Sequence, residues 1–191
     1  MTTAASNDPI RLEVVVASVR AGRIAPVVAD WFAATARQHA EFDVGVLDLA
    51  ETPLPQDLSG GPDADAFTRR IGAADAFVVV TSEYNHGYPA ALKTAIDTVK
   101  REWRTKPVGF VSYGGLSGGL RAVEQLRQVV VEVHMVPVRQ SVSFHRVKHA
   151  FAAAGTTTDE AAIDGAERML DQIAWWARTV RAGTALDRYP G

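Results

Sequence analysis

Five short apolar runs, each bounded by polar, glycine or proline residues, predict five β-strands. The third run, AFVVVT, is continuously apolar up to its last residue, Thr81. Such a run is typical of a strand that is buried on both faces in the middle of a parallel sheet. The predicted strands are Arg11–Ala17, Phe42–Leu49, Ala76–Thr81, Val108–Tyr113 and Val133–Arg139.

Between and after these runs, apolar residues recur at helical spacing. Pro26 suits the first turn of a helix. In the last helix we expect Trp175, Trp176 and Val180 to pack on the sheet, and we expect a long connection, Ser141–Thr158, before it. The predicted helices run from near Pro26 to Ala36, from about Asp63 to Ala73, and over Pro89–Trp103, Leu120–Glu132 and Asp159–Ala182.

The alternation of strands and helices implies a parallel sheet with helices on both faces and right-handed crossovers. The expected fold class is α/β, a flavodoxin-like three-layer sandwich whose five-stranded parallel sheet has the order 2-1-3-4-5. A chain of 191 residues fits a single domain, residues 1–191. We expect its core to span residues 10–183, with tails at 1–9 and 184–191.

The amino-acid composition of the chain excludes several classes of function. The formal net charge of −2 provides no global positive field, so we expect neither a nucleic acid nor a membrane as partner. The lack of cysteine excludes disulfides, thiolate metal sites and thiol nucleophiles. Met1–Asp8 is short and polar rather than a signal peptide, and no apolar run approaches the roughly 18 residues that span a bilayer. We therefore expect a soluble, cytoplasmic protein.

Candidate chemistry concentrates in three loops. In an open α/β sheet, ligands bind beyond the carboxyl ends of the strands, at the point where strand order reverses. For the expected order that point lies between the first and third strands. The loops after the first, third and fourth strands then face one crevice, and these loops have the most unusual compositions in the chain.

The loop after the first strand, Ser18–Arg23, offers a hydroxyl group, two arginines and a glycine just before a helix. Helix N-termini and arginines both bind phosphate oxygens, so a phosphomonoester is the expected ligand. Two solvated arginines in an ordinary turn would fit the spacing equally well. The loop has neither a Walker A ending nor the G-x-G-x-x-G fingerprint, which argues against an ATPase and against Rossmann-type binding of NAD.

The other two loops are polar or rich in glycine. Ser82–Pro89 offers backbone groups and aromatic rings to a planar heterocycle, or it simply caps the next helix. Ser112–Gly119 contains four glycines, which let the backbone approach a ligand closely, or which form a flexible entry to the next helix. Taken singly, each of these two loops favours the structural interpretation, and only the convergence of all three loops favours a site.

Three segments together resemble the NADPH-dependent FMN reductases, a family also described as NAD(P)H:quinone or chromate-type reductases. The family's G-S-x-R pattern is matched by Ala17–Arg20, and its S-Y-G-G-x-x-G-G pattern by Ser112–Gly119. Its long P-E-Y-N-x-G-x-P-x-x-L-K-N-A-I-D pattern is matched from Glu83 to Asp97, which reads EYNHGYPAALKTAID. Departures that remove no charged or aromatic group occur at Ala17, Ser82 and Thr94.

This resemblance implies that the chain binds flavin mononucleotide (FMN), with NADPH or NADH as electron donor and ping-pong kinetics. The chemistry would take place at flavin N5, so no catalytic side chain is implied. The implied phosphate ligands are Ser18, Arg20 and Arg23. The implied neighbours of the isoalloxazine ring are Glu83, Tyr84, Asn85, Gly87, Ser112, Tyr113, Gly114 and Gly115.

The resemblance also implies partners. The acceptors would be small molecules such as quinones, free flavin, azo compounds or metal oxyanions. Members of the family usually form homodimers or homotetramers, with the helix that carries Leu92–Val99 near the interface. His86 is expected to be a solvent-exposed loop residue.

Three alternatives remain. An FMN-binding electron carrier or redox sensor would share the fold and the site but would not turn over NAD(P)H. A serine hydrolase is a remote alternative, because Gly115–Gly119 matches G-x-S-x-G around Ser117, with Glu132 and then His145 or His149 downstream. His145 and His149 also have a spacing that suits zinc on a helix, although surface histidines are the better interpretation and no metal site is expected.

Overall fold

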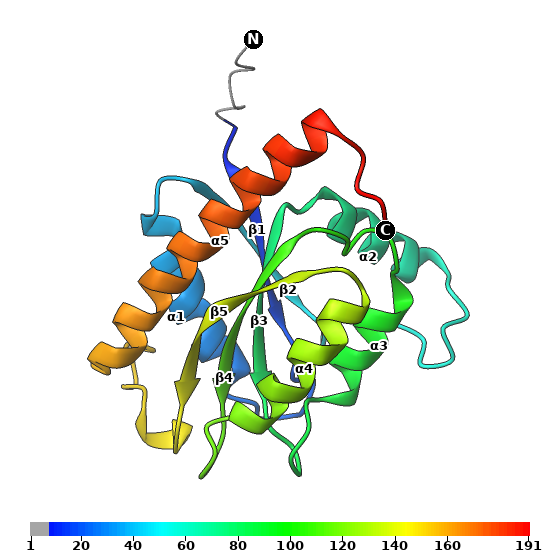
Figure 1. The fold of residues 1–191 in the computed structure, drawn as a ribbon. Helices are drawn as coiled ribbons and strands as arrows, with labels where there is room; N and C mark the ends of the chain where they lie inside the picture. Colours follow the sequence, from blue (N-terminus) through cyan, green and yellow to red (C-terminus); the bar gives the residue numbers. More distant parts are fainter. Residues whose placement is uncertain (1–7) are drawn as a thin grey trace.

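The structure, a computed structural model, describes residues 8–191 (Figure 1). The predictions made for Met1–Asn7 lie outside the described residues. Five parallel strands form one sheet with the order β2-β1-β3-β4-β5, which confirms the predicted fold class and strand order. The strands are β1 (Ile10–Val16), β2 (Phe42–Asp48), β3 (Ala76–Ser82), β4 (Pro107–Tyr113) and β5 (Val136–Phe144).

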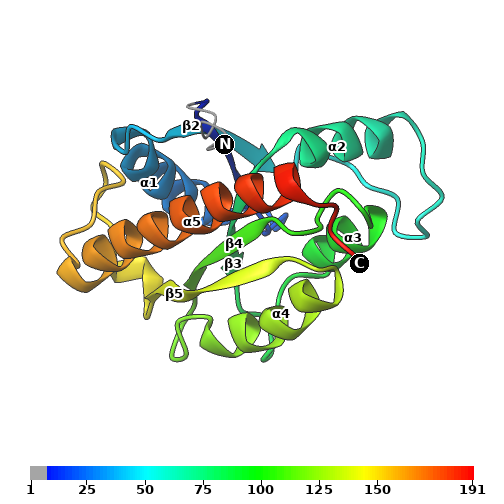
Figure 2. The ribbon, with the colours of Figure 1, turned by 45° about the horizontal axis from the view of Figure 1, so that its top comes forward.

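Helices cover both faces of the sheet and give three layers (Figure 1). Helices α1 (Ala25–Gln38) and α5 (Glu160–Leu186) pack on one face, and α2 (Pro62–Ala73), α3 (Ala90–Thr98) and α4 (Leu120–Glu132) pack on the other. A short 3₁₀ helix, η1 (Val147–His149), precedes α5. Figure 2 shows α5 crossing its face from the segment after η1 to the C-terminal end of the chain.

The central strands explain why this fold forms. Every residue of β3 and of β4 is buried, because helices lie on both sides of them. Continuous apolar runs are therefore required there, whereas β2, at the edge of the sheet, has an intermittent burial pattern. No helix within residues 8–191 combines enough length with enough apolar character to traverse a lipid bilayer.

The last strand differs from its prediction. It was expected at Val133–Arg139, but β5 begins at Val136 and continues to Phe144, so the first part of the expected long connection belongs to the sheet. Val133 instead caps the C-terminal end of α4, and His134 takes a left-handed turn with φ of 60°. Because β5 is an edge strand, polar residues near its middle can face solvent, and their polarity does not end the strand.

Two predictions about tryptophans also need correction. The third helix ends at Thr98 rather than at Trp103, and a turn then returns the Trp103 ring to the same core. That ring lies 4.8 Å from the Phe77 ring, and its Nε1 donates to the Ile96 carbonyl at 3.2 Å. Trp175 does not pack on the sheet, because its side of α5 faces solvent and the residue is 55% exposed, while the neighbouring Trp176 packs partly against the core.

Candidate functional site

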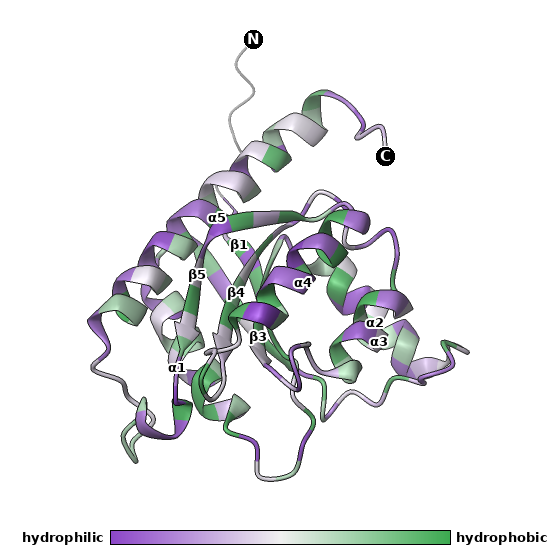
Figure 3. Cartoon of the chain, turned by 60° about the horizontal axis from the view of Figure 1, so that its bottom comes forward, coloured by the Kyte–Doolittle hydropathy of each residue, from purple (hydrophilic) through white to green (hydrophobic). Residues whose placement is uncertain are grey.

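The three candidate loops meet at the carboxyl end of the sheet, at the bottom of Figure 1. Figure 3 brings this end forward and shows hydrophilic and hydrophobic segments mixed around the ends of apolar strands. A side-chain contact joins two of the loops, because Ser18 Oγ and Tyr84 Oη share a hydrogen bond of 2.7 Å. The predicted convergence of residues that are 66 positions apart is thus present in the fold.

Buried hydroxyl groups lie at the centre of this meeting point. Ser18 is 1% exposed, Ser82 is 4% exposed and Tyr113 is 5% exposed. Burial raises the pKa of Tyr113 to about 12, against the opposing effect of the Ser82 and Ser18 hydroxyls. Within residues 8–191, neither Ser82 Oγ nor Tyr113 Oη has a hydrogen-bond partner. A buried polar group without a partner costs about 1–3 kcal/mol, so this cluster has unused capacity to bind a polar ligand.

The loop after β1 places its two arginines differently. Arg20 is exposed, and its side chain forms no hydrogen bond or ion pair with any described residue. Arg23 is only partly exposed, and its Nη2 contacts Asp48 Oδ2 at 2.5 Å. Its Nε atom is buried without a partner among the described residues. The sequence analysis missed Asp48, whose only signal was its place at the end of β2, beside the end of β1.

The start of α1 is compatible with an anion. Its N-cap residue, Ile24, provides no side-chain cap, and Pro26 lies in the first turn. The remaining backbone N–H groups of that turn have no partner from a capping side chain. Such groups, together with the positive end of the helix dipole, favour a phosphate. The loop therefore combines a free cation with an uncapped helix start.

The loop after β3 contains a tight two-residue turn. The backbones of Tyr84 and Gly87 pair in both directions, at 2.8 and 3.1 Å. Between them, Asn85 and His86 both have positive φ angles, of 49° and 78°. This turn leaves Tyr84, Asn85 and His86 exposed at the rim, and the exposure of His86 agrees with its predicted surface position.

Glu83 turns away from that rim. Its side chain is 4% exposed and forms an ion pair with Arg121 in the first turn of α4. Burial opposes ionisation of Glu83, but hydrogen bonds from Arg121 and Ser117 outweigh it and hold the pKa of this carboxyl below its usual value. Glu83 thus joins the loop after β3 to the loop after β4. Sequence reasoning missed both partners, because neither lies near Glu83 in the chain.

These contacts weaken the hydrolase alternative. The Nδ1 atom of His145, one of the two histidines that the hydrolase alternative needs, bonds the Leu116 carbonyl at 2.8 Å. Glu132 ends α4, and α4 begins beside Ser117, so about 18 Å of helix separates the two residues. No group of three or more His, Cys, Asp or Glu side chains in residues 8–191 is placed to hold a metal ion.

The glycines of the loop after β4 have two different tasks. Gly119 has φ of 86°, and a Cβ there would lie 2.7 Å from Ser112 Cβ. Gly118 has φ of 62°, and a Cβ there would lie 2.4 Å from Ser143 Oγ. Both positions require glycine because a Cβ would collide with these neighbours. The same turn is held by Ser112, whose Oγ donates to the Gly118 carbonyl at 2.8 Å. Only Gly115 faces open space, with nothing within 4 Å of its Cβ position.

Comparison with known proteins agrees with this geometry. The sequence profile of the family described as NADPH-dependent FMN reductase matches residues 10–149. An NAD(P)H-dependent FMN reductase of Schizosaccharomyces pombe is 35% identical over 151 residues, which cover 72% of this chain and 75% of that protein. An NADPH:quinone oxidoreductase of Arabidopsis thaliana is 31% identical over 125 residues, which cover 62% of this chain and 64% of that protein.

A solved structure is similar over nearly the whole fold. The flavoenzyme NAD(P)H:(acceptor) oxidoreductase FerB from Paracoccus denitrificans superposes with a TM-score of 0.72 at 23% sequence identity, covering 89% of this chain and 98% of that chain. The family profile spans well over half of the 191 residues, including all three loops of the site. This chain belongs to the NADPH-dependent FMN reductase family.

Proposed function

We propose that the whole chain acts as one FMN-binding domain that passes electrons from NADPH or NADH to small acceptors. The observation that carries this proposal is the pair of buried hydroxyl groups, Ser82 Oγ and Tyr113 Oη, that have no partner within residues 8–191. A heterocycle with several carbonyl and ring nitrogen atoms would supply the missing hydrogen bonds. Membership of the family agrees with that ligand.

The FMN phosphate is assigned to the loop after β1. Arg20 supplies a guanidinium group with no competing partner among the described residues, and the uncapped start of α1 supplies backbone N–H groups. Arg23 shares its charge with Asp48, so its unpartnered Nε is the atom left for the ligand. Ser18 is buried at the base of this loop, where its hydroxyl holds the Tyr84 ring in place.

The isoalloxazine ring is assigned to the other two loops. Tyr84, Asn85 and Gly87 would line one side, with Glu83 contributing backbone while its carboxylate holds Arg121. The opposite side would be lined by Ser112, Tyr113, Gly114 and Gly115, of which Gly115 is the most open to an approaching ligand. This division leaves no side chain with the task of a catalytic acid or base.

Bound FMN supplies hydride acceptance at N5 and onward electron transfer to an acceptor such as a quinone, free flavin, an azo compound or a metal oxyanion. The chain's own contribution is to hold the ring against the buried hydroxyls while leaving the rim at Tyr84 open, since Tyr84 is 37% exposed. One open slot serves donor and acceptor in turn, which predicts ping-pong kinetics.

The finer points of assembly and location are part of the same proposal. We assign the chain to homodimers or homotetramers that meet near α3, whose outer surface carries an ion pair between Lys93 and Asp97. We also assign the chain to the cytoplasm, where both proposed donors, NADPH and NADH, are available. Light scattering of the purified protein measures the number of copies directly.

Anaerobic spectroscopy tests the proposal. The purified protein, supplied with FMN, is expected to show the two visible absorbance bands of a bound flavin and to bleach when NADPH is added. A yellow protein that does not bleach with NADPH or NADH would identify a carrier or sensor instead. A colourless protein that does not take up added FMN would refute the assignment of the site.

Matched variants make the test specific. Arg20→Gln removes the proposed phosphate cation and is expected to weaken FMN binding about tenfold. Arg37→Gln removes an exposed arginine from the other end of α1 and is expected to leave FMN binding unchanged. Equal FMN affinities for the two variants would show that Arg20 does not contact the ligand.

A further inference from the structure

A basic segment, which we call the strap, follows β5 and lies against the glycine-rich loop after β4, Ser112–Gly119. It comprises residues 145–149, with the sequence HRVKH. Together with Gly114 and Gly115, residues Arg146–His149 line a cavity of about 250 Å³. The same two glycines are assigned to the flavin ring, so this cavity borders the proposed flavin site on the side of β5.

The strap lies in a stretch of chain that has no negative side chains. No aspartate or glutamate occurs between Glu132 and Asp159, although the whole chain has a net charge of −2. Arg146, Lys148 and His149 are exposed, and their side chains form no hydrogen bond or ion pair with any residue in 8–191. Three basic groups without acidic partners around one cavity favour an anionic occupant.

Backbone hydrogen bonds hold the strap in place before any ligand arrives. The Arg146 N–H donates to the Gly115 carbonyl at 2.8 Å, and the Val147 N–H donates to the Gly114 carbonyl at 3.1 Å. Arg146 has a left-handed backbone with φ of 48°, which is uncommon for a residue with a long side chain. These two hydrogen bonds tie the strap to Gly114 and Gly115, so the cavity is already formed without a ligand.

The position separates this cavity from the FMN phosphate loop. Neighbouring strands lie about 4.8 Å apart, and β3 and β4 stand between β1 and β5. The strands that lead into the strap and into the loop assigned to the FMN phosphate are thus about 14 Å apart. The cavity is also smaller than the roughly 300–1,000 Å³ of a complete small-molecule site, so it fits one group of a larger ligand.

We infer that the cavity formed by Gly114, Gly115 and residues Arg146–His149 binds a phosphate group of the dinucleotide electron donor. The inference rests on the proposed function, because a donor whose nicotinamide lies on the flavin must extend its phosphates away from the ring. That phosphate is either the 2′-phosphate, which only NADPH carries, or the pyrophosphate, which NADPH and NADH share.

The test compares two double variants of the FMN-loaded protein. Arg146→Asn with Lys148→Gln removes two cations from the cavity, and asparagine tolerates the left-handed backbone at position 146. Lys100→Gln with Arg168→Gln changes the net charge equally at exposed positions outside the cavity. Calorimetric dissociation constants for NADP⁺ and NAD⁺, and KM and kcat for NADPH and NADH, are measured for both variants and for the unmodified protein.

The cavity variant is expected to bind NADP⁺ about tenfold more weakly, with kcat and FMN content unchanged, whereas the control variant matches the unmodified protein. If NAD⁺ binding stays constant, the cavity holds the 2′-phosphate. If NAD⁺ binding weakens equally, the cavity holds the pyrophosphate. Unchanged binding of both nucleotides, or equal losses in both double variants, would overturn the inference. An unmodified protein that does not bleach with either donor would instead overturn the proposed function.

Discussion

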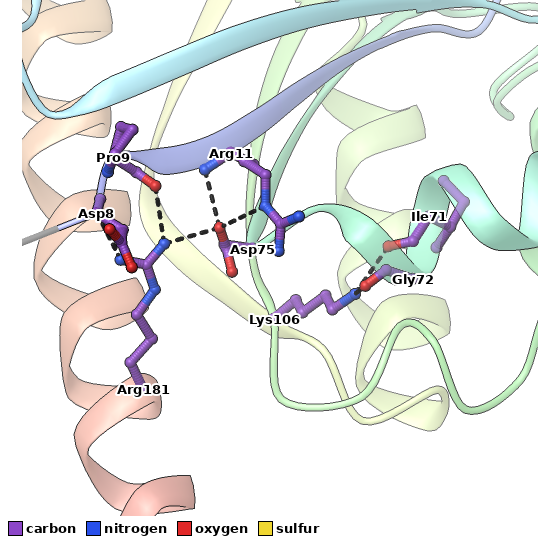
Figure 4. A network of polar contacts seen from close by, with 8 residues as sticks. All are labelled: Asp8, Pro9, Arg11, Ile71, Gly72, Asp75, Lys106 and Arg181. Carbon is purple, nitrogen blue, oxygen red and sulfur yellow. Dashed lines mark hydrogen bonds and ion pairs between the residues drawn. The ribbon is translucent and has the colours of Figure 1, made fainter. Parts of the chain in front are cut away.

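The two ends of one sheet treat their polar groups in opposite ways. At the amino end, before the strands begin, charged side chains are bound to one another and to backbone carbonyls (Figure 4). At the carboxyl end, the hydroxyls of Ser82 and Tyr113 are buried without a hydrogen bond from any described residue. The same strands run between the two ends, so the composition of the strands does not explain why polar groups are paired at one end and unpaired at the other.

Asp75 organises the amino end. Its Oδ2 accepts hydrogen bonds from the Arg11 backbone N–H at 2.9 Å and from Arg181 at 2.8 Å. Burial opposes ionisation of Asp75, but these donors outweigh it and hold the pKa of the carboxyl below its usual value. Because Arg181 also reaches the Asp8 and Pro9 carbonyls, the last helix is tied to the beginning of the first strand.

Lys106 completes that end of the molecule. Its Nζ donates to the carbonyls of Ile71 and Gly72, at 2.8 and 3.1 Å, near the end of α2. The contrast between the two ends indicates which polar groups contribute to stability and which are left for ligand binding. Polar contacts at the amino end stabilise the fold, while the carboxyl end has unpartnered hydroxyls and turns with positive φ angles, which suit the proposed ligand site. Four variants test this division.

The largest expected effect is at Gly119, which packs closely against Ser112 at the carboxyl end. In Gly119→Ala, the new Cβ would be 2.7 Å from Ser112 Cβ on a backbone with φ of 86°. We expect the free energy of unfolding to fall by about 3 kcal/mol and FMN binding to be lost. Urea unfolding and flavin absorbance measure the two effects. Gly183→Ala, with open space in α5, is the control and is expected to be neutral or slightly stabilising.

Asp75→Ala tests the polar contacts at the amino end of the sheet. It leaves the Arg11 N–H and the Arg181 guanidinium without their acceptor, so the free energy of unfolding is expected to fall by about 2 kcal/mol. FMN affinity of the folded variant is expected to stay unchanged, because the proposed FMN site is at the other end of the strands. A parallel loss of FMN affinity below the unfolding transition would contradict the division between the two ends.

Tyr113→Phe sharpens the comparison, because its two effects have opposite signs. Removing a buried hydroxyl that has no partner among the described residues is expected to raise the free energy of unfolding of the FMN-free protein by about 1 kcal/mol. The same change is expected to weaken FMN binding about tenfold. Equilibrium urea unfolding and flavin titration measure these quantities. A less stable FMN-free variant would show that the hydroxyl is already satisfied in the fold.

The smallest expected effect is a pH dependence at the amino end. Burial lowers the pKa of Lys106 from 10.5 to about 8, with Asp75 and Glu102 opposing. Between these values the unfolded chain binds more protons than the folded one, so this lysine makes stability rise with pH. Relative to Lys106→Met, the unmodified protein is expected to gain about 1 kcal/mol in free energy of unfolding from pH 7.5 to 9.5.

The upper pH limit of that experiment matters. Burial raises the pKa of Tyr113 from 10.0 to about 12, so above pH 10 the unfolded chain loses its tyrosine proton first and stability falls as pH rises. The two ends of the sheet therefore contribute opposite slopes. A difference between the two proteins that does not change from pH 7.5 to 9.5 would show that Lys106 titrates normally in the fold.

Much of the fold and the place of the candidate site follow from local patterns. The run at Ala76–Thr81 predicts a central strand because a strand covered on both faces is apolar at nearly every position rather than at alternate ones. The alternation of elements predicts the strand order, and the order predicts which loops converge, as the bond between Ser18 and Tyr84 bears out. The motif at Glu83–Asp97 predicts the family, which the profile match confirms.

The sequence by itself determined the elements, the layers and the three loops, because hydrophobic period and turn chemistry act over a few neighbouring residues. Only the tertiary structure decided the pairings of Arg23 with Asp48 and of Glu83 with Arg121. It also decided how far β5 continues and that Trp175 faces solvent. These outcomes depend on distances between residues far apart in the chain and on which surface a neighbouring element covers, and no local pattern records either of them.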